Sequence, residues 1–307
     1  MPLDDLKNRG NALWRDVSNQ ALVKREELAR KTVAKREELA RKTGAARDEF
    51  TRKTELARED LTRKAEQARE ELTRRADLAR QDGPQGVHGP ALKLAWGELG
   101  AITPKVSGRL PIALAAHPQP IMLLPGFGAH PLRMRRMMRL LRRAGHRPHE
   151  WGMGWNMGPT PENFAFLQTR VAQLAEQEGE PLALVGWSLG GIYAREIAKQ
   201  IPDAVAKVIT MGSPFSGDMH ANNGWRAYQL VTGHPVDAPP IPGNFAQKPP
   251  VPTIALWSPK DGVVSPRSAA GWPGERDRAV AVRCNHLGFS HDPAVIAEVL
   301  RQLDWAD

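Results

Sequence analysis

The chain has 307 residues, a net charge of +9 and one cysteine, Cys284, so an intramolecular disulfide and a disulfide-stapled secreted scaffold are excluded. No apolar run approaches the ~20 residues that a transmembrane helix needs, and residues 1–6 lack the basic and apolar regions of a signal peptide. We therefore expect a cytoplasmic protein.

Residues 25–80 repeat with a period of eleven. The sequence of 25–32 recurs at 36–43 and, with variation, from Arg47, Arg58 and Arg69. Eleven residues fill three helical turns at about 3.67 residues per turn, close to the α-helical value. In the repeats, acidic residues precede basic residues by four positions, the favourable order for ion pairs on a helix. The pattern predicts one long charged helix over about 3–81, on the order of 110 Å at ~1.5 Å per residue.

A narrow apolar stripe runs along this helix. Its large members recur every eleven residues and are Leu28, Leu39, Phe50, Leu61 and Leu72. Three interpretations stay open: an exposed spacer, self-association with a slight right-handed supercoil, or contact of residues 3–81 with a lipid or granule surface, for which a basic polar face is typical. The last would make the protein peripheral on a membrane or granule surface.

Glycine and proline are dense between residues 81 and 90, which indicates that the helix ends there in a linker. We expect three parts: a long charged helix with eleven-residue repeats over 1–82, a linker over 83–90, and a catalytic domain over 91–307. The ~217 residues of the last part suffice to bury one core.

The first core strand is expected at residues 120–124, and it runs into the sequence P-G-F-G at 125–128. The two glycines let the backbone approach a substrate carbonyl closely, so the N–H of Phe127 is a candidate oxyanion donor. In the next helix, 133–143, apolar residues would face the sheet and arginines water, with an anionic surface or an acidic substrate as the alternative for those arginines. No nucleic-acid motif accompanies them, and no nucleic-acid partner is expected.

The pentapeptide at 186–190 reads G-W-S-L-G, which fits G-x-S-x-G. It follows an apolar run, 182–185, and precedes a segment with helical spacing, 191–198. Strand, sharp turn and helix form the context of a nucleophile elbow. We therefore expect Ser188 to be the nucleophile and the N–H of Leu189 to be the second oxyanion donor.

A serine nucleophile needs a base and an acid that orients the base. Asp261 follows the apolar run 253–257 and is the favoured acid, with Asp218 as the alternative. His286 follows the run 279–283 and is the favoured base. His291 is the alternative, although it lies at the expected start of the closing helix. The histidines lack metal-binding spacing, so neither a metal nor a cofactor is expected.

These motifs resemble the α/β-hydrolase superfamily over roughly residues 105–305. More narrowly, they look like bacterial lipase- and esterase-like hydrolases that carry P-G-F, G-W-S-x-G-G, G-S-P-F and G-x-N-x-G, here at 125–127, 186–191, 212–215 and 154–158. The resemblance implies a mostly parallel sheet flanked by helices, with Ser188, Asp261 and His286 as a catalytic triad. The segment 216–252, where a lipase has its lid, is short, rich in proline and glycine and not strongly apolar, which favours an esterase over an interfacial lipase.

The sequence therefore predicts an α/β-hydrolase domain behind a long charged helix. We expect it to cleave carboxylic esters of small-molecule or lipid-like acids through an acyl-enzyme. Acyl transfer, thioester hydrolysis and amide hydrolysis would use the same residues. A different class of function, a helix-mediated scaffold or surface-binding protein with a degenerate hydrolase domain, is the further alternative.

Overall fold

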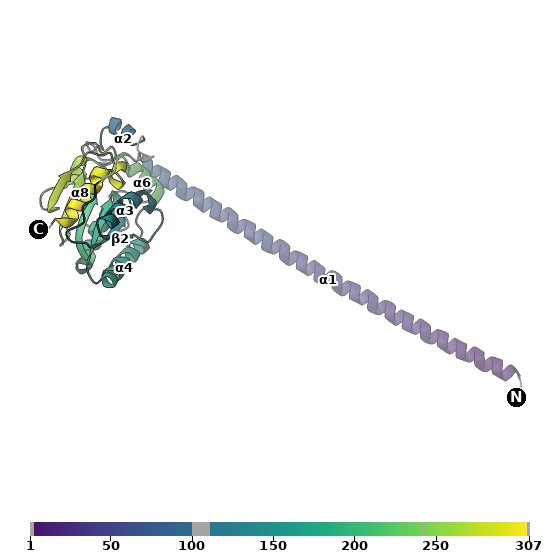
Figure 1. Cartoon of the computed structure of the whole chain (residues 1–307). Helices are drawn as coiled ribbons and strands as arrows, with labels where there is room; N and C mark the ends of the chain where they lie inside the picture. Colours follow the sequence, from purple (N-terminus) through teal and green to yellow (C-terminus); the bar gives the residue numbers. More distant parts are fainter. Residues whose placement is uncertain (1–2, 100–110, 242, 306–307) are drawn as a thin grey trace. The chain divides into compact units, whose positions relative to one another are not determined.

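The structure is a computed structural model that describes residues 3–99, 111–241 and 243–305, with residues 3–23, Ala29 and Leu99 described by their backbone alone (Figure 1). Its internal contacts divide the chain into two compact units, Met1–Glu70 and Glu71–Asp307. Among the described residues, no helix is both long and apolar enough to cross a bilayer.

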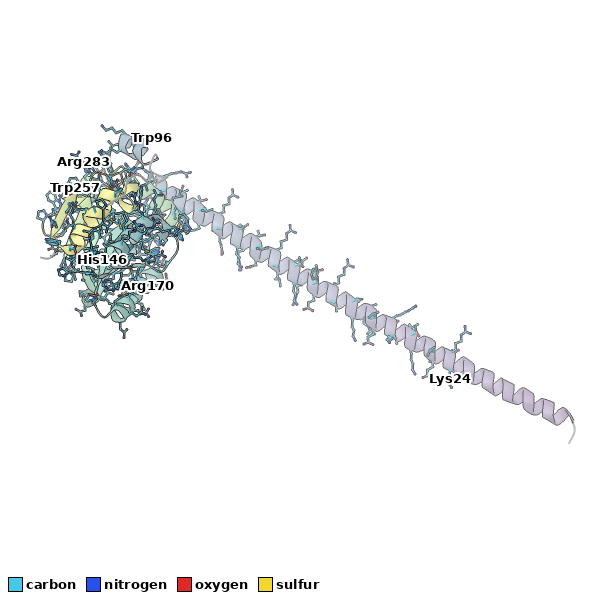
Figure 2. The ribbon with its side chains drawn as sticks, viewed as in Figure 1. Lys24, Trp96, His146, Arg170, Trp257 and Arg283 are labelled. Atoms are coloured by element: carbon cyan, nitrogen blue, oxygen red, sulfur yellow. The ribbon has the colours of Figure 1, made fainter. Side chains whose placement is uncertain are left out.

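Helix α1, Leu3–Arg80, confirms the long charged helix expected from the eleven-residue repeat. Ion pairs one turn apart recur along it, as in Glu27–Lys31 at 2.7 Å and Glu38–Lys42 at 2.8 Å. The side chains of this helix from Lys24 onward project away from its axis (Figure 2). Such exposed pairs contribute roughly 0.3–0.5 kcal/mol each. The stripe residue Phe50 is 72% exposed, so the described first unit is stabilised by local interactions along one helix.

The last turns of α1 belong to the second unit. Arg75 donates a hydrogen bond to the carbonyl oxygen of Val231 at 2.7 Å, and the side-chain amide of Gln229 donates to that of Leu78 at 2.9 Å. All four of these residues are within Glu71–Asp307, so the helix end after Glu70 packs as part of the second unit.

Six parallel strands form one sheet in the described part of the chain, in the order β2-β1-β3-β4-β5-β6. They are β1 Pro120–Leu124, β2 Arg147–Glu150, β3 Leu182–Trp187, β4 Val205–Met211, β5 Thr253–Trp257 and β6 Arg278–Ala281. The run predicted as a strand at 279–283 is shorter and starts one residue earlier, because the chain turns toward the His286 loop after Ala281.

Helices cover both faces of the sheet. The helices after α1 are α2 Leu92–Leu99, α3 Arg135–Arg143, α4 Pro161–Glu178, α5 Leu189–Gln200, α6 Trp225–Thr232, α7 Pro266–Ala270 and α8 Pro293–Asp304, with short 3-10 turns at Pro131–Met134, Pro202–Ala204 and Leu287–Ser290. Helices α3 and α8 lie on one face of the sheet and α4 and α5 on the other. Successive side chains of a strand point to opposite faces. Ile121 and Leu123 accordingly pack in one core cluster with α3 and α8, whereas Met122 and Leu124 pack in the other with α4 and α5.

This parallel arrangement brings the carboxyl ends of the strands to one edge, where α/β sheets place their sites. The loops after β1, β3, β5 and β6 all begin at that edge. They carry the residues that the sequence singled out for chemistry.

Candidate active site

Ser188 lies in the turn between β3 and α5 and has φ 54° and ψ −121°. A positive φ is strained for a residue with a Cβ and occurs most often at functional sites. A Cβ on Gly186 would collide with the carbonyl oxygen of Gly190, and one on Gly190 with that of Leu124. The two glycines of the G-x-S-x-G motif therefore allow the close backbone packing of the tight turn that carries Ser188.

The two expected oxyanion donors flank this serine. A Cβ on Gly126 would lie 3.2 Å from the Cβ of Ser188, so the loop that carries Phe127 packs directly against this serine. Leu189 is the first residue of α5, and the first four N–H groups of a helix have no acceptor within it. The helix end also places a positive partial charge beside Ser188.

Asn156, a buried residue of the G-x-N-x-G segment, fixes the loop after β1. Its side-chain amide Nδ2 donates to the carbonyl oxygen of Pro125 at 2.8 Å, and its backbone carbonyl oxygen accepts from the N–H of Gly128 at 2.7 Å. The sequence identified the segment but assigned this asparagine no role. Its contacts hold Phe127 in place from both sides.

His286 and Asp261 form a buried hydrogen bond, with Nδ1 of the imidazole 2.9 Å from Oδ2 of the carboxylate. The other oxygen, Oδ1, accepts from the N–H groups of Val263 and Val264, both at 2.8 Å. A carboxylate can only accept, so Nδ1 of His286 carries the proton and Nε2 is left as a base. That is the tautomer that general-base catalysis requires.

The two alternatives lie in other surroundings. Asp218 pairs with His220 at 2.9 Å in a partly exposed loop. Nδ1 of His291 lies 3.1 Å from the hydroxyl of Ser290, and burial lowers the pKa of His291. His291, unlike His286, is not among the described residues that line the cavity beside Ser188.

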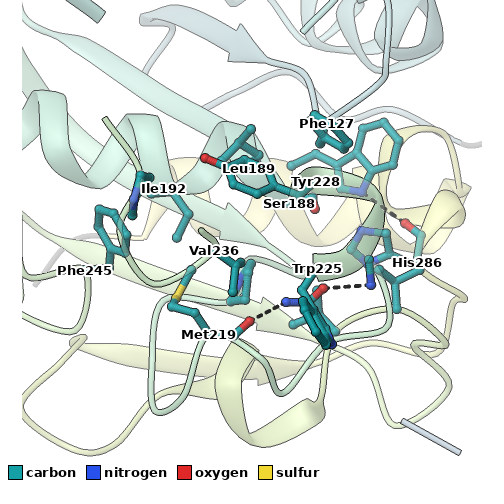
Figure 3. Close-up of a pocket in the computed structure, with 18 of the residues that line it drawn as sticks. Phe127, Ser188, Leu189, Ile192, Met219, Trp225, Tyr228, Val236, Phe245 and His286 are labelled. Atoms are coloured by element: carbon teal, nitrogen blue, oxygen red, sulfur yellow. Dashed lines mark hydrogen bonds between the residues drawn. The ribbon is translucent and has the colours of Figure 1, made fainter. Parts of the chain in front are cut away.

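A cavity of about 230 Å³ opens beside Ser188 and His286. In Figure 3, these two residues lie at one side of the cavity, and Ile192 and Phe245 lie at the other. The lining is mainly apolar and consists of Gly126, Phe127, Pro159, Trp187, Ser188, Leu189, Ile192, Pro214, Met219, Asn222, Gly224, Trp225, Tyr228, Val236, Pro239, Ile241, Phe245, Val263, Val264, His286 and Leu287. Among the described residues, no group of three or more His, Cys, Asp or Glu is arranged to hold a metal ion.

Comparison with known families agrees with this geometry. Residues 119–231 match the family described as alpha/beta hydrolase fold, a stretch that includes β1, the elbow and α6. The chain has the α/β-hydrolase fold. This confirms the fold expected from the sequence motifs.

Individual proteins similar to this chain match it either over a short stretch or at low sequence identity. A pimeloyl-[acyl-carrier protein] methyl ester esterase of Aliivibrio salmonicida is 45% identical over 56 residues, which span 18% of this chain and 21% of that relative. The carboxylesterase CesB of Bacillus subtilis is 15% identical with a TM-score of 0.43, covering 62% of this chain and 85% of its own. A structure from work on LipS and LipT, two metagenome-derived lipolytic enzymes, is 16% identical with a TM-score of 0.45, covering 63% of this chain and 94% of its own.

The segment after Ser216 contributes more to the α/β-hydrolase cavity than its composition indicated. It forms α6, whose Trp225 and Tyr228 line the cavity, and a following loop that adds Val236 and Phe245. The rings of Phe127 and Tyr228 lie 5.5 Å apart, which joins this wall to the loop after β1. The segment is not strongly apolar in composition, but its scattered apolar residues converge at the cavity in the fold.

Arg195 of α5 holds this wall in place. Its side chain is fully buried and donates hydrogen bonds to the carbonyl oxygens of Phe245 at 2.9 Å, Gln247 at 3.1 Å and Glu275 at 2.9 Å. Burial lowers the pKa of Arg195 to about 10, so the guanidinium stays charged at neutral pH and makes charge-assisted hydrogen bonds. Because α5 begins directly after Ser188, this cation connects the helix that follows Ser188 to the cavity wall.

Two further residues of the α/β-hydrolase contact the backbone of His286. The indole N–H of Trp187 donates to the His286 carbonyl oxygen at 3.1 Å, and a carboxylate oxygen of Glu98 accepts from the His286 N–H at 2.7 Å. Sequence analysis assigned neither residue a role. Trp187 lies inside the elbow motif and could have been considered, whereas nothing around Glu98 in the sequence connects it to a loop far along the chain.

Proposed function

We propose that the protein is a serine hydrolase that cleaves carboxylic esters with an apolar acyl group. One observation carries the proposal: His286, hydrogen-bonded to the buried Asp261, lines the same cavity as a strained serine, and the rest of that cavity is mainly apolar. The pair supplies a base in the required tautomer, and the walls supply a site for hydrocarbon.

In the proposed reaction, Oγ of Ser188 attacks the ester carbonyl carbon while Nε2 of His286 takes the serine proton. The N–H groups of Phe127 and Leu189 bind the oxygen of the tetrahedral intermediate. The intermediate collapses, the alcohol leaves with the proton from His286, and an acyl-serine remains. Water then attacks this ester with the same proton transfers and releases the acid. Asp261 stabilises the imidazolium at both stages.

The acyl group is expected to be uncharged and mostly hydrocarbon. Burial of each CH₂ group contributes about 0.8 kcal/mol, which corresponds to about a fourfold rise in kcat/KM per added carbon. The rise should stop when the cavity is full. A carboxylate in the acyl chain would instead be buried against Ile192 and Phe245 without a partner.

The test combines activity with chemical labelling. Wild type and Ser188→Ala are assayed on p-nitrophenyl esters of increasing chain length, and each is treated with a fluorophosphonate probe whose attachment site is mapped by mass spectrometry. We expect hydrolysis and labelling at Ser188 in wild type and neither in the variant. Equal hydrolysis by the two proteins would refute the mechanism. The absence of labelling at Ser188 would favour the scaffold alternative.

Acyl transfer is the second candidate, because Trp225, Tyr228 and Phe127 surround the serine with apolar surface that limits the access of water. An added alcohol would then compete with water for the acyl-enzyme. Product analysis with and without an alcohol acceptor distinguishes the two. Thioester and amide substrates in the same series would define the leaving group.

A further inference from the structure

Glu98 lies near the end of α2, in a part of the chain that precedes the stretch matched to the hydrolase family. Its side chain is buried and accepts three backbone hydrogen bonds. Oε1 accepts from the N–H of Gly262 at 3.0 Å and from that of His286 at 2.7 Å, and Oε2 accepts from that of Leu287 at 3.0 Å. One carboxylate therefore joins the loop after β5 to the loop after β6.

These two loops carry the acid and the base. Gly262 directly follows Asp261, and a Cβ at Gly262 would collide with the backbone of Leu94 and Ala95 in α2. The helix thus lies against the acid loop by its backbone as well as through Glu98. Both carboxylate oxygens of Asp261 already have partners, because Oδ1 accepts from Val263 and Val264 and Oδ2 accepts from His286.

Three hydrogen bonds hold His286, one to its ring and two to its backbone. Asp261 fixes the ring through Nδ1, Trp187 donates to the carbonyl oxygen, and Glu98 accepts from the N–H. The backbone contacts determine where the ring can reach, because they set the origin of the side chain. Displacement of a reacting group by about 1 Å can cost on the order of 10²-fold in rate.

We propose that Glu98 is a positioning residue that sets the distance between His286 and Ser188, an inference that rests on the proposed function. It fits the role because an ionised carboxylate has enough lone pairs for three N–H donors and makes charge-assisted hydrogen bonds to them. A glutamine keeps one acceptor oxygen for two of the donors, but its NH₂ group then faces the third donor. An alanine leaves all three N–H groups without acceptors.

The experiment compares Glu98→Ala, Glu98→Gln and Lys207→Ala in the full-length protein. Lys207 is the matched control: it is as buried as Glu98, and its ammonium donates to the carbonyl oxygens of Gln302, Leu303 and Trp305 at the amino-terminal end of β4, away from the active-site edge. For each protein, kcat, KM, the labelling rate of Ser188 by a fluorophosphonate and Tm are measured.

We expect Glu98→Ala to lower kcat and the labelling rate by about 10²-fold with KM changed by less than roughly threefold, because Glu98 does not line the cavity. Glu98→Gln should restore part of the loss. Lys207→Ala should lower Tm without a comparable fall in kcat, which separates positioning from general destabilisation.

Three outcomes would overturn the inference. Equal rates of Ser188 labelling in wild type and Glu98→Ala would exclude the positioning role but leave the proposed function intact. If Lys207→Ala loses as much kcat as Glu98→Ala for the same fall in Tm, the loss in Glu98→Ala reflects destabilisation, and Glu98 is only a stabilising residue. The absence of Ser188-dependent labelling in wild type would overturn the proposed function together with this role.

Discussion

Asp261→Asn changes one atom at the hydrogen bond that we assign to the triad. The asparagine oxygen can still accept from Val263 and Val264, which now donate to Oδ1 at 2.8 Å, so the loop should keep its conformation. Its NH₂ group, however, replaces the oxygen that lies 2.9 Å from Nδ1 of His286. Nδ1 must then accept, the proton moves to Nε2, and the base is lost.

The expected loss follows from that tautomer. Where an aspartate of a serine hydrolase is replaced in this way, kcat falls by about 10⁴-fold, equivalent to ~5 kcal/mol of transition-state stabilisation. Steady-state kcat on a p-nitrophenyl ester measures it, with Tm as the check on folding. Asp218→Asn is the control, because Asp218 pairs with His220 in a partly exposed loop, and it should leave kcat unchanged. The reasoning is refuted if Asp261→Asn loses less than about tenfold in kcat, or if Asp218→Asn loses more.

Three more predictions concern other parts of the chain. His291→Gln should retain most of the esterase activity whereas His286→Gln loses it, and the reverse result would exchange their roles. Burial raises the pKa of the Cys284 thiol, so the thiolate is scarce at pH 8. A thiol reagent should therefore modify Cys284 slowly in the native protein and rapidly in urea. Fast reaction in the native protein would contradict the buried site. Deletion of residues 1–70 should leave Tm and kcat unchanged, whereas deletion of 1–82 should lower Tm, because only the latter removes helix contacts within the second unit; sedimentation of the same proteins tests self-association.

The long helix and the sheet could be predicted because their signals are local. The eleven-residue period specifies helix within any two repeats, and the apolar runs before Ser188 and Asp261 are long enough for buried strands. The order of the motifs along the chain then indicated which loops would meet, because parallel strands bring their carboxyl ends to one edge.

The partners of the site residues could not be predicted in the same way. His286 and His291 follow the same strand within ten residues, and only the fold determines which ring faces Asp261. Glu98 contacts a residue 188 positions later, and no spacing rule spans that separation. The apolar wall around Tyr228 was missed for a related reason, since its members are dispersed among glycines and prolines in the sequence.

The buried guanidinium of Arg195 has a consequence for how the rate depends on the physical state of the substrate. In enzymes with a movable lid, the opening of the lid can set the rate. Here, opening the wall at Phe245 would separate carbonyl oxygens from a buried cation, at roughly 1.5–3 kcal/mol for each hydrogen bond to a charged group. The wall should therefore stay in place on monomers and micelles alike. We expect the saturation curve for a soluble ester to pass smoothly through its critical micelle concentration, and an abrupt rise at that point would mean that the wall moves.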